Sequence, residues 1–128
     1  MISVIIPTLN EASRIGALLE ALAREDTAYE VIVADGDSDD DTVTIARRLG
    51  ASLLSTVWGR GQQLFAGAAK ARGDVLLFLH ADSVFPAGGL AWIVHAIVGQ
   101  TALVGGNFYI HFDGDDKFSR WLDGFYVW

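Results

Sequence analysis

The sequence contains no cysteine and little positive charge, and both shortages exclude classes of function. Without cysteine the chain forms neither disulfide bonds nor thiolate metal sites. The formal net charge is −7, so no broad basic surface is available and we expect no nucleic acid as a partner. An acidic protein that binds a phosphorylated ligand needs a local cation, from a metal ion or a few placed arginines.

Long apolar runs are absent as well. The longest apolar region, residues 88–99, is too short to span a bilayer and contains His95, which we interpret as a structural histidine among apolar helix residues. No basic stretch precedes the first apolar run, as it would in a signal peptide. We therefore expect a soluble, cytoplasmic protein. Its 128 residues, 52% of them hydrophobic, suit one domain with a substantial core.

Short apolar runs alternate with segments of helical spacing over roughly the first hundred residues. Short loops between such elements force parallel strands with right-handed crossovers. We therefore predict an open, mostly parallel, doubly wound α/β sheet with helices on both faces and the strand order three-two-one-four. The predicted strands are residues 2–6, 29–34, 51–57, 75–79 and 103–112, and the later helices are residues 42–49, 59–72, 86–99 and 117–128.

Two of these elements carry more specific predictions. The first helix should be capped by Thr8 or Asn10, with Glu11 near its positive end and a buried stripe that ends at Leu22. The run at residues 75–79 is continuously apolar, which predicts a strand buried on both faces of the sheet.

Polar residues follow three of the predicted strands, at the end where parallel sheets bind ligands. They occupy residues 7–11, residues 35–41 and residues 80–82. With the predicted strand order, a crevice opens between the first and fourth strands. We expect the first and third of these loops to flank the ligand, with the second loop beside them.

The loop after the fourth strand combines a carboxylate with an imidazole. Asp82, with His80 nearby, has the chemistry of a Mn²⁺ or Mg²⁺ ligand when diphosphate oxygens complete the shell. The alternative is that Asp82 caps a turn and His80 packs. His80 also has the chemistry to bind a phosphate without a metal.

Asp35 ends a buried strand, where a carboxylate can accept a hydrogen bond from a nucleobase N–H or a ribose hydroxyl. The alternative is an Asx-turn or a helix cap. Asp37, Asp39, Asp40 and Asp41 fit that alternative, because they precede a helix whose dipole favours anions.

Arg60 lies between two glycines at a predicted helix start, where an arginine can approach a phosphate closely. A solvated surface arginine is the alternative. Gln63 lies one turn further along the same helix and is expected to face the same crevice.

Taken together, these motifs resemble the nucleotide-binding half of an inverting family 2 glycosyltransferase with the GT-A fold. The matching stretches are residues 2–11, 35–42 and 68–82, in the expected order and spacing. The sequence His80-Ala81-Asp82 and the pair Gly59-Arg60 are similar to a subgroup labelled arsenosugar-biosynthesis glycosyltransferases. The resemblance covers nearly the whole chain.

The resemblance implies a UDP- or GDP-sugar donor, transfer with inversion to an unknown acceptor, and a divalent Mn²⁺ or Mg²⁺ cofactor. It implies that Asp35 holds the base and that Asp82 coordinates the metal on the diphosphate. The full set of expected nucleotide-binding residues is Pro7, Thr8, Asn10, Glu11, Asp35, Arg60, Gln63, His80 and Ala81.

Three features depart from the family pattern. Gly36 stands where the family often has a second aspartate, and the metal motif begins with His80 where the family usually has aspartate. No residue matches the family's catalytic base, since Asp113, Asp115 and Asp116 come too early for it. We therefore expect a single nucleotide-sugar-binding domain that lacks its acceptor and catalytic-base portion.

Two other functions stay open at this point. One is a nucleotide-sugar binding module without catalysis. The other is a nucleotidyltransferase-like domain, which usually needs a glycine-rich loop with a basic residue after the first strand, and residues 7–11 have none.

The last positions of the sequence are rich in large apolar side chains. A patch of that kind needs to be covered by further chain, by a partner including a second copy, or by a membrane surface. The residues concerned are Phe118, Trp121, Phe125, Tyr126, Val127 and Trp128.

Overall fold

The computed structural model describes residues 1–98 and 105–108. Contacts divide the chain into two units, Met1–Ala96 and Ile97–Trp128. The predicted helix at 117–128 with its aromatic side chains, and the three aspartates at 113, 115 and 116, lie outside the described residues. Of the predicted strand at 103–112, residues 105–108 are described and form no regular element.

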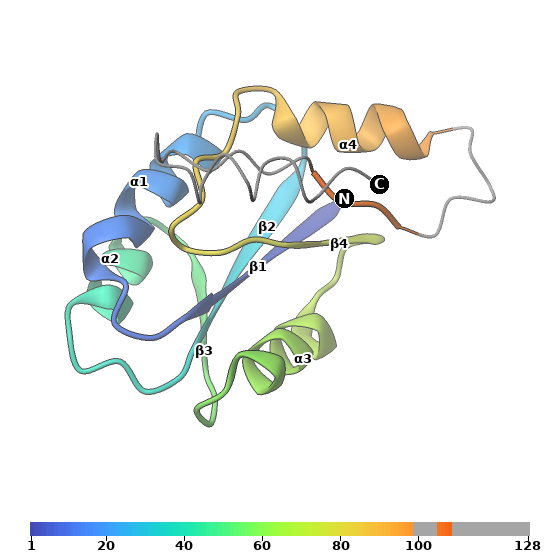
Figure 1. Ribbon diagram of the computed structural model, residues 1–128. Helices are drawn as coiled ribbons and strands as arrows, with labels where there is room; N and C mark the ends of the chain where they lie inside the picture. Colours follow the sequence, from blue (N-terminus) through green and yellow to red (C-terminus); the bar gives the residue numbers. More distant parts are fainter. Residues whose placement is uncertain (99–104, 109–128) are drawn as a thin grey trace, which may run out of the picture. The chain divides into compact units, whose positions relative to one another are not determined.

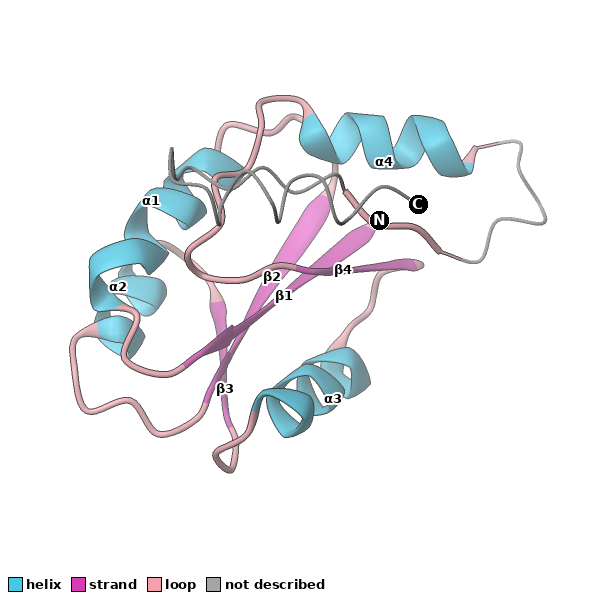
Figure 2. Ribbon diagram, viewed as in Figure 1, coloured by secondary structure: helices cyan, strands magenta, loops and turns pink. Residues whose placement is uncertain are grey.

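Strands and helices alternate in the described part of the chain, as predicted (Figure 1, Figure 2). The strands form one parallel sheet in the order β3-β2-β1-β4, which confirms the predicted order. The elements are β1 Ile2–Thr8, α1 Ala12–Leu22, β2 Tyr29–Asp35, α2 Thr42–Arg48, β3 Ser52–Ser55, α3 Arg60–Lys70, β4 Val75–Phe78 and α4 Gly89–Ile97.

Strand β1 continues through Pro7 to Thr8, although we expected it to end before the proline. The direction of the ladder bonds explains this. Ile5 accepts a hydrogen bond from the Leu79 N–H on the β4 side, and in a strand the nitrogen two residues later faces the same side. The missing N–H of Pro7 therefore faces the end of β4, where the pairing with β1 stops, while the pairing of β1 with β2 continues to Thr8 and Asp35.

One face of the sheet carries the main hydrophobic core. Every second residue of β1, including Val4 and Ile6, packs against the buried stripe of α1 and against Leu90 of α4. The predicted stripe is confirmed, because Ile15, Leu18, Leu19 and Leu22 are all buried. Figure 1 shows α1, α2 and α4 on this side of the sheet and α3 on the other side.

Helix α4 begins at Gly89 and not at Pro86, because the chain first turns through Gly88 at a left-handed φ of 75°. The Glu25 carboxylate then accepts hydrogen bonds from the backbone N–H groups of Gly88 and Leu90, at 2.7 and 3.0 Å. His95 is exposed on this helix, which does not support its interpretation as a structural histidine. Among residues 1–98 and 105–108, no helix combines the length and apolar character needed to cross a membrane.

The opposite face is covered by α3, which packs against β1 and β2. It approaches closely, and a Cβ atom on Gly67 would lie 2.5 Å from Cγ2 of Ile5. Strand β4 is at the edge of the described sheet, beyond this helix. Its residues Leu76 and Phe78 are 42% and 49% exposed, so the prediction that this strand is buried on both faces is wrong.

The Glu30 carboxylate joins β1, β2 and the turn after α3. Ser3 Oγ and the Arg72 backbone N–H donate to Oε1 of Glu30 at 2.7 and 2.6 Å. The Arg72 Nε donates to Oε2 at 2.9 Å, and Arg72 Nη2 lies 2.8 Å from the same oxygen. The hydrogen bonds from Ser3 and then Arg72 lower the pKa of Glu30 to about 2.

The free energy of unfolding should therefore fall as the pH drops from 4.5, the ordinary pKa of this group, to about 2. Within this window the unfolded chain takes up a proton at Glu30 while the folded chain leaves it ionised. Urea unfolding across the window measures the slope, which Glu30→Gln should flatten. Glu20→Gln, on the exposed side of α1, is the control, and equal slopes for wild type and Glu30→Gln would contradict the prediction.

Candidate functional site

The ends of β1 and β2 are joined by a buried pair of side chains. Thr8 Oγ1 donates a hydrogen bond to Oδ1 of Asp35 at 2.8 Å, and the two residues are 2% and 6% exposed. Ser38 donates twice to the same carboxylate, from its hydroxyl to Oδ1 at 2.6 Å and from its backbone N–H to Oδ2 at 2.9 Å. Asp35 therefore organises its own turn, as the alternative interpretation predicted.

The loops after β1 and β2 are bonded to each other. The backbone N–H of Asn10 donates to Ser38 Oγ at 2.9 Å, and the Asn10 side-chain oxygen accepts from the Asp39 N–H at 3.0 Å. Asn10 adopts a left-handed φ of 56°, which asparagine tolerates better than most residues. The convergence predicted for the first and second loops is confirmed.

The start of α1 is capped from the second loop and from the first residue of α2, so the predicted caps at Thr8 and Asn10 are wrong. Thr42 Oγ1 accepts from the Glu11 N–H at 2.8 Å, and Asp40 Oδ2 accepts from the Ala12 N–H at 3.0 Å. Glu11 precedes the helix without a capping hydrogen bond from its own side chain. The side chains of Thr8 and Asn10 are instead committed to the neighbouring loop.

Asp40 serves the starts of two helices at once. Its Oδ1 accepts hydrogen bonds from the Thr42 hydroxyl and from the Thr42 N–H, the latter at 2.9 Å, while its other oxygen accepts from Ala12. The hydrogen bond from the Thr42 hydroxyl is the main cause that lowers the pKa of Asp40. Ser38 and Thr42 are not among the predicted site residues, although their spacing from Asp35 and Asp40 is typical of side-chain turns.

Gln63 reaches from α3 to the same strand ends. It is 5% exposed, and its amide nitrogen donates to the backbone oxygens of Thr8 and Ala34 at 2.6 and 3.0 Å. The Thr8 oxygen also accepts from the Gly36 N–H at 2.9 Å. Both amide hydrogens of Gln63 are thus used within the protein, and the residue forms part of the wall behind Thr8 and Asp35.

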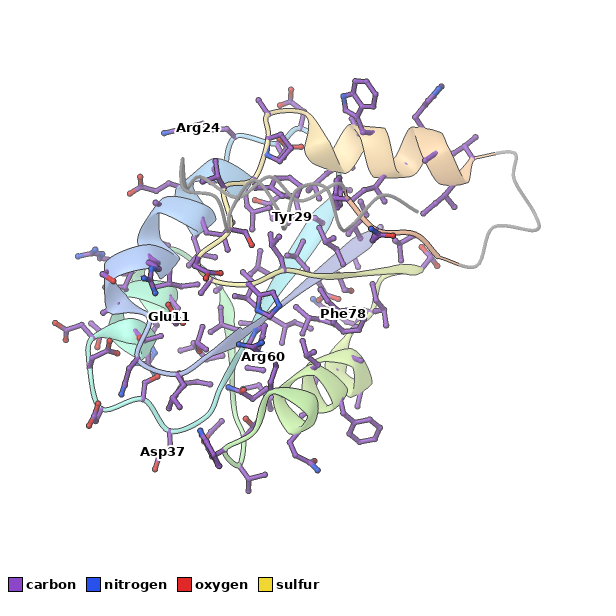
Figure 3. The ribbon with its side chains drawn as sticks, in the orientation of Figure 1. Glu11, Arg24, Tyr29, Asp37, Arg60 and Phe78 are labelled. Carbon is purple, nitrogen blue, oxygen red and sulfur yellow. The ribbon has the colours of Figure 1, made fainter. Side chains whose placement is uncertain are left out.

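Arg60 is the first residue of α3 and is exposed. Gly59 before it has a φ of 130°, which favours glycine, so the tight turn onto the helix start requires this residue. Figure 3 shows Arg60 at the start of α3, and Asp37 on its loop with the side chain directed away from the sheet.

The third loop follows β4 at the same edge of the sheet. Leu79 continues the pairing with β1, and Ala81 is buried in the core, while His80 and Asp82 are exposed. Among the described residues, no hydrogen bond joins this loop to residues 7–11. The described residues also contain no group of three or more His, Asp or Glu able to hold a metal by themselves.

A hollow of about 370 Å³ opens beside Asp35. It lies toward β3 and α2, on the other side of β2 from the crevice that we predicted between β1 and β4. Its walls are Asp35, Asp37, Ser38, Val43, Arg47, Leu53, Leu54 and Ser55.

Comparison with known proteins identifies relatives of this chain. The sequence profile of glycosyl transferase family 2 matches residues 3–125. The 4,4'-diaponeurosporenoate glycosyltransferase of Staphylococcus haemolyticus is 37% identical over 89 residues, which are 63% of this chain and 24% of that protein. The protein of the same name from Staphylococcus aureus is 31% identical over 91 residues, 66% of this chain and 24% of that protein.

Solved structures share the fold. Glucosyl-3-phosphoglycerate synthase from Mycobacterium tuberculosis, in complex with Mn²⁺, UDP and glucosyl-3-phosphoglycerate, aligns with a TM-score of 0.67 and 29% identity over 77% of this chain and 40% of that chain. A mannosyltransferase from Pyrobaculum calidifontis, in complex with GDP-Man and Mn²⁺, aligns with a TM-score of 0.67 and 30% identity over 73% of this chain and 31% of that chain.

These matches confirm the predicted GT-A type of α/β fold. The chain spans about a quarter of the length of the curated relatives that it matches. The resemblance to the arsenosugar-biosynthesis subgroup is not tested by them and stays a prediction. Because the family profile covers residues 3–125 of 128, this chain belongs to glycosyl transferase family 2.

Proposed function

We propose that this chain carries the donor site of a glycosyltransferase. The enzyme would transfer the sugar of a UDP- or GDP-sugar, with inversion, to an acceptor still to be identified. The observation that carries the proposal is the buried Thr8–Asp35 pair at the ends of two neighbouring strands. The loop with Asp82 follows the strand on the other side of β1. The family membership and the nucleotides named in the two aligned structures support the same chemistry.

The base and ribose would bind at the first two loops. A carboxylate offers about four lone-pair positions. Asp35 uses two on Oδ1 and one on Oδ2 for Thr8 and Ser38, which leaves one position on Oδ2 for a nucleobase N–H. Pro7, Asn10 and Glu11 flank Thr8 in the sequence and would line the base and ribose.

The diphosphate would bind between the start of α3 and the loop after β4. Arg60 and His80 are exposed and would contact phosphate oxygens, with Ala81 in the wall of the site. Asp82 is an exposed oxygen donor, and a Mn²⁺ or Mg²⁺ ion commonly uses one or two carboxylates together with substrate phosphates. The residues present therefore fit such an ion, which when bound would stabilise the negative charge on the departing diphosphate.

Asp82→Asn should remove the enhancement of UDP or GDP binding by Mn²⁺, because the amide is a much weaker ligand for a hard cation. Isothermal titration with and without Mn²⁺ measures this. Asp26→Asn is the matched control, since Asp26 is exposed in the loop between α1 and β2. An unchanged Mn²⁺ dependence in Asp82→Asn would refute the assigned role.

A thermal-shift screen of nucleoside diphosphates and their sugars, with and without Mn²⁺, tests the proposal as a whole. A ligand that binds the folded chain raises the melting temperature by mass action. We expect shifts for UDP or GDP compounds, and the absence of any shift would contradict the proposal. Hydrolysis of the bound sugar nucleotide separates an enzyme from a binding module without catalysis.

A further inference from the structure

Gln63 binds the backbone directly beneath the proposed base-recognition pair. Its amide nitrogen donates to the carbonyl of Thr8 and to the carbonyl of Ala34, the peptide oxygen that precedes Asp35. The partners are 55 and 29 positions away in the sequence, so this one side chain joins α3, β1 and β2. At 5% exposure the amide is sheltered from water, which would otherwise compete for these carbonyls.

The space for this amide exists because residue 36 has no side chain. A Cβ atom on Gly36 would lie 2.9 Å from Nε2 and 3.4 Å from Cδ of Gln63. It would also lie 3.5 Å from the Thr8 oxygen. A larger residue at position 36 therefore requires the Gln63 amide to shift from its bound position, although Gly36 itself needs no left-handed backbone.

We propose that Gln63 is a positioning residue for nucleobase recognition, held in the space that Gly36 leaves and acting through the backbone of Thr8 and Asp35. This inference rests on the proposed function and deepens it. Hydrogen bonds weaken steeply when their angle or distance changes, so recognition by Asp35 depends on a fixed strand end. At the phosphate end of the site, Asp82 lies in the loop after β4. Arg60 lies on α3 but is exposed and is not a partner of the Gln63 amide.

The test compares ligands that contain a base with one that does not. Gln63→Met keeps the length of the side chain but removes both N–H donors. We expect it to raise the Kd of UDP or GDP about tenfold, the effect of losing roughly one buried hydrogen bond. The Kd of Mn²⁺-pyrophosphate should stay unchanged. Gln62→Met, at the exposed neighbouring position, is the matched control and should change neither Kd.

A double-mutant cycle tests the role of Gly36. Gly36→Ala alone should weaken UDP or GDP binding, because the new Cβ displaces the Gln63 amide. In the Gln63→Ala background the space is free, so adding Gly36→Ala should have little further effect on Kd or melting temperature. Gly61→Ala, on α3 with no atom within 4 Å of its Cβ position, is the control for adding a methyl group.

The outcomes separate this inference from the function on which it rests. If the wild-type chain binds neither UDP nor GDP, both the proposed function and this inference are overturned. If it binds them and Gln63→Met leaves their Kd unchanged, or weakens Mn²⁺-pyrophosphate equally, the inference alone fails. Additive effects of Gly36→Ala and Gln63→Ala would also overturn it. Should Gln63→Ala not fold, Gln63→Met and Gly36→Ala still decide the question through the two ligands.

Discussion

Replacing Asp35 by alanine should lower the free energy of unfolding by about 2–4 kcal/mol and raise the Kd for UDP or GDP at least tenfold. The carboxylate accepts three hydrogen bonds, from Thr8 and twice from Ser38, and the variant leaves these donors without their partner. Chemical denaturation gives the stability, and isothermal titration well below the melting temperature gives the affinity.

Two matched variants separate the two effects of Asp35. Asp39→Ala removes an exposed carboxylate from the same loop and should change little in either measurement. Ser38→Ala weakens the turn but leaves the carboxylate, so it should lower stability with a smaller loss of nucleotide affinity. If Ser38→Ala and Asp35→Ala reduce affinity equally, Asp35 is an organiser of the turn and not a partner of the base.

Gly67→Ala should destabilise the chain by about 2–3 kcal/mol, the usual cost of forcing extra volume into a packed core. The added Cβ would lie 2.5 Å from Cγ2 of Ile5, and Ile5 is fully buried with a β-branched, stiff side chain. Helix α3 must therefore move away from the sheet, and Gln63 moves with it. Thermal and urea unfolding measure the loss, and weaker binding of UDP or GDP should accompany it.

Gly61→Ala is the control within the same helix. Nothing lies within 4 Å of the added Cβ, and alanine is favoured over glycine in a helix by about 1 kcal/mol. This variant should keep or slightly raise the stability. If Gly67→Ala were as stable as Gly61→Ala, the close approach of α3 to β1 would be refuted.

The order and type of the elements followed from local sequence patterns. Alternating apolar runs and helical stripes such as Ile15–Leu22 predict a parallel sheet, because the short connections leave few other topologies. The end of a helix or strand is less well specified. Pro7 belongs to β1 because its nitrogen faces the end of β4 and the pairing with β2 continues past it. Gly88 moves the start of α4, and both features depend on neighbouring elements.

The position of β4 at the edge of the described sheet decides which of its side chains are exposed. The sequence Val75–Phe78 has no polar residue, so its pattern predicts burial on both sides. Helix α3 lies over β1 and β2, which leaves Leu76 and Phe78 at the edge of its cover. The sequence of β4 alone does not show where helix α3 will pack on the sheet.

The sequence by itself determined the α/β alternation, the strand order and the clustering of acidic and polar loops at one edge of the sheet, because spacing and short connections encode these features locally. Tertiary structure decided which side chain does what in those loops. Asp40 and Thr42 cap a helix that starts 28 to 31 positions earlier, and Gln63 binds a carbonyl 55 positions away. Such hydrogen bonds require strand ends that only the folded sheet brings together.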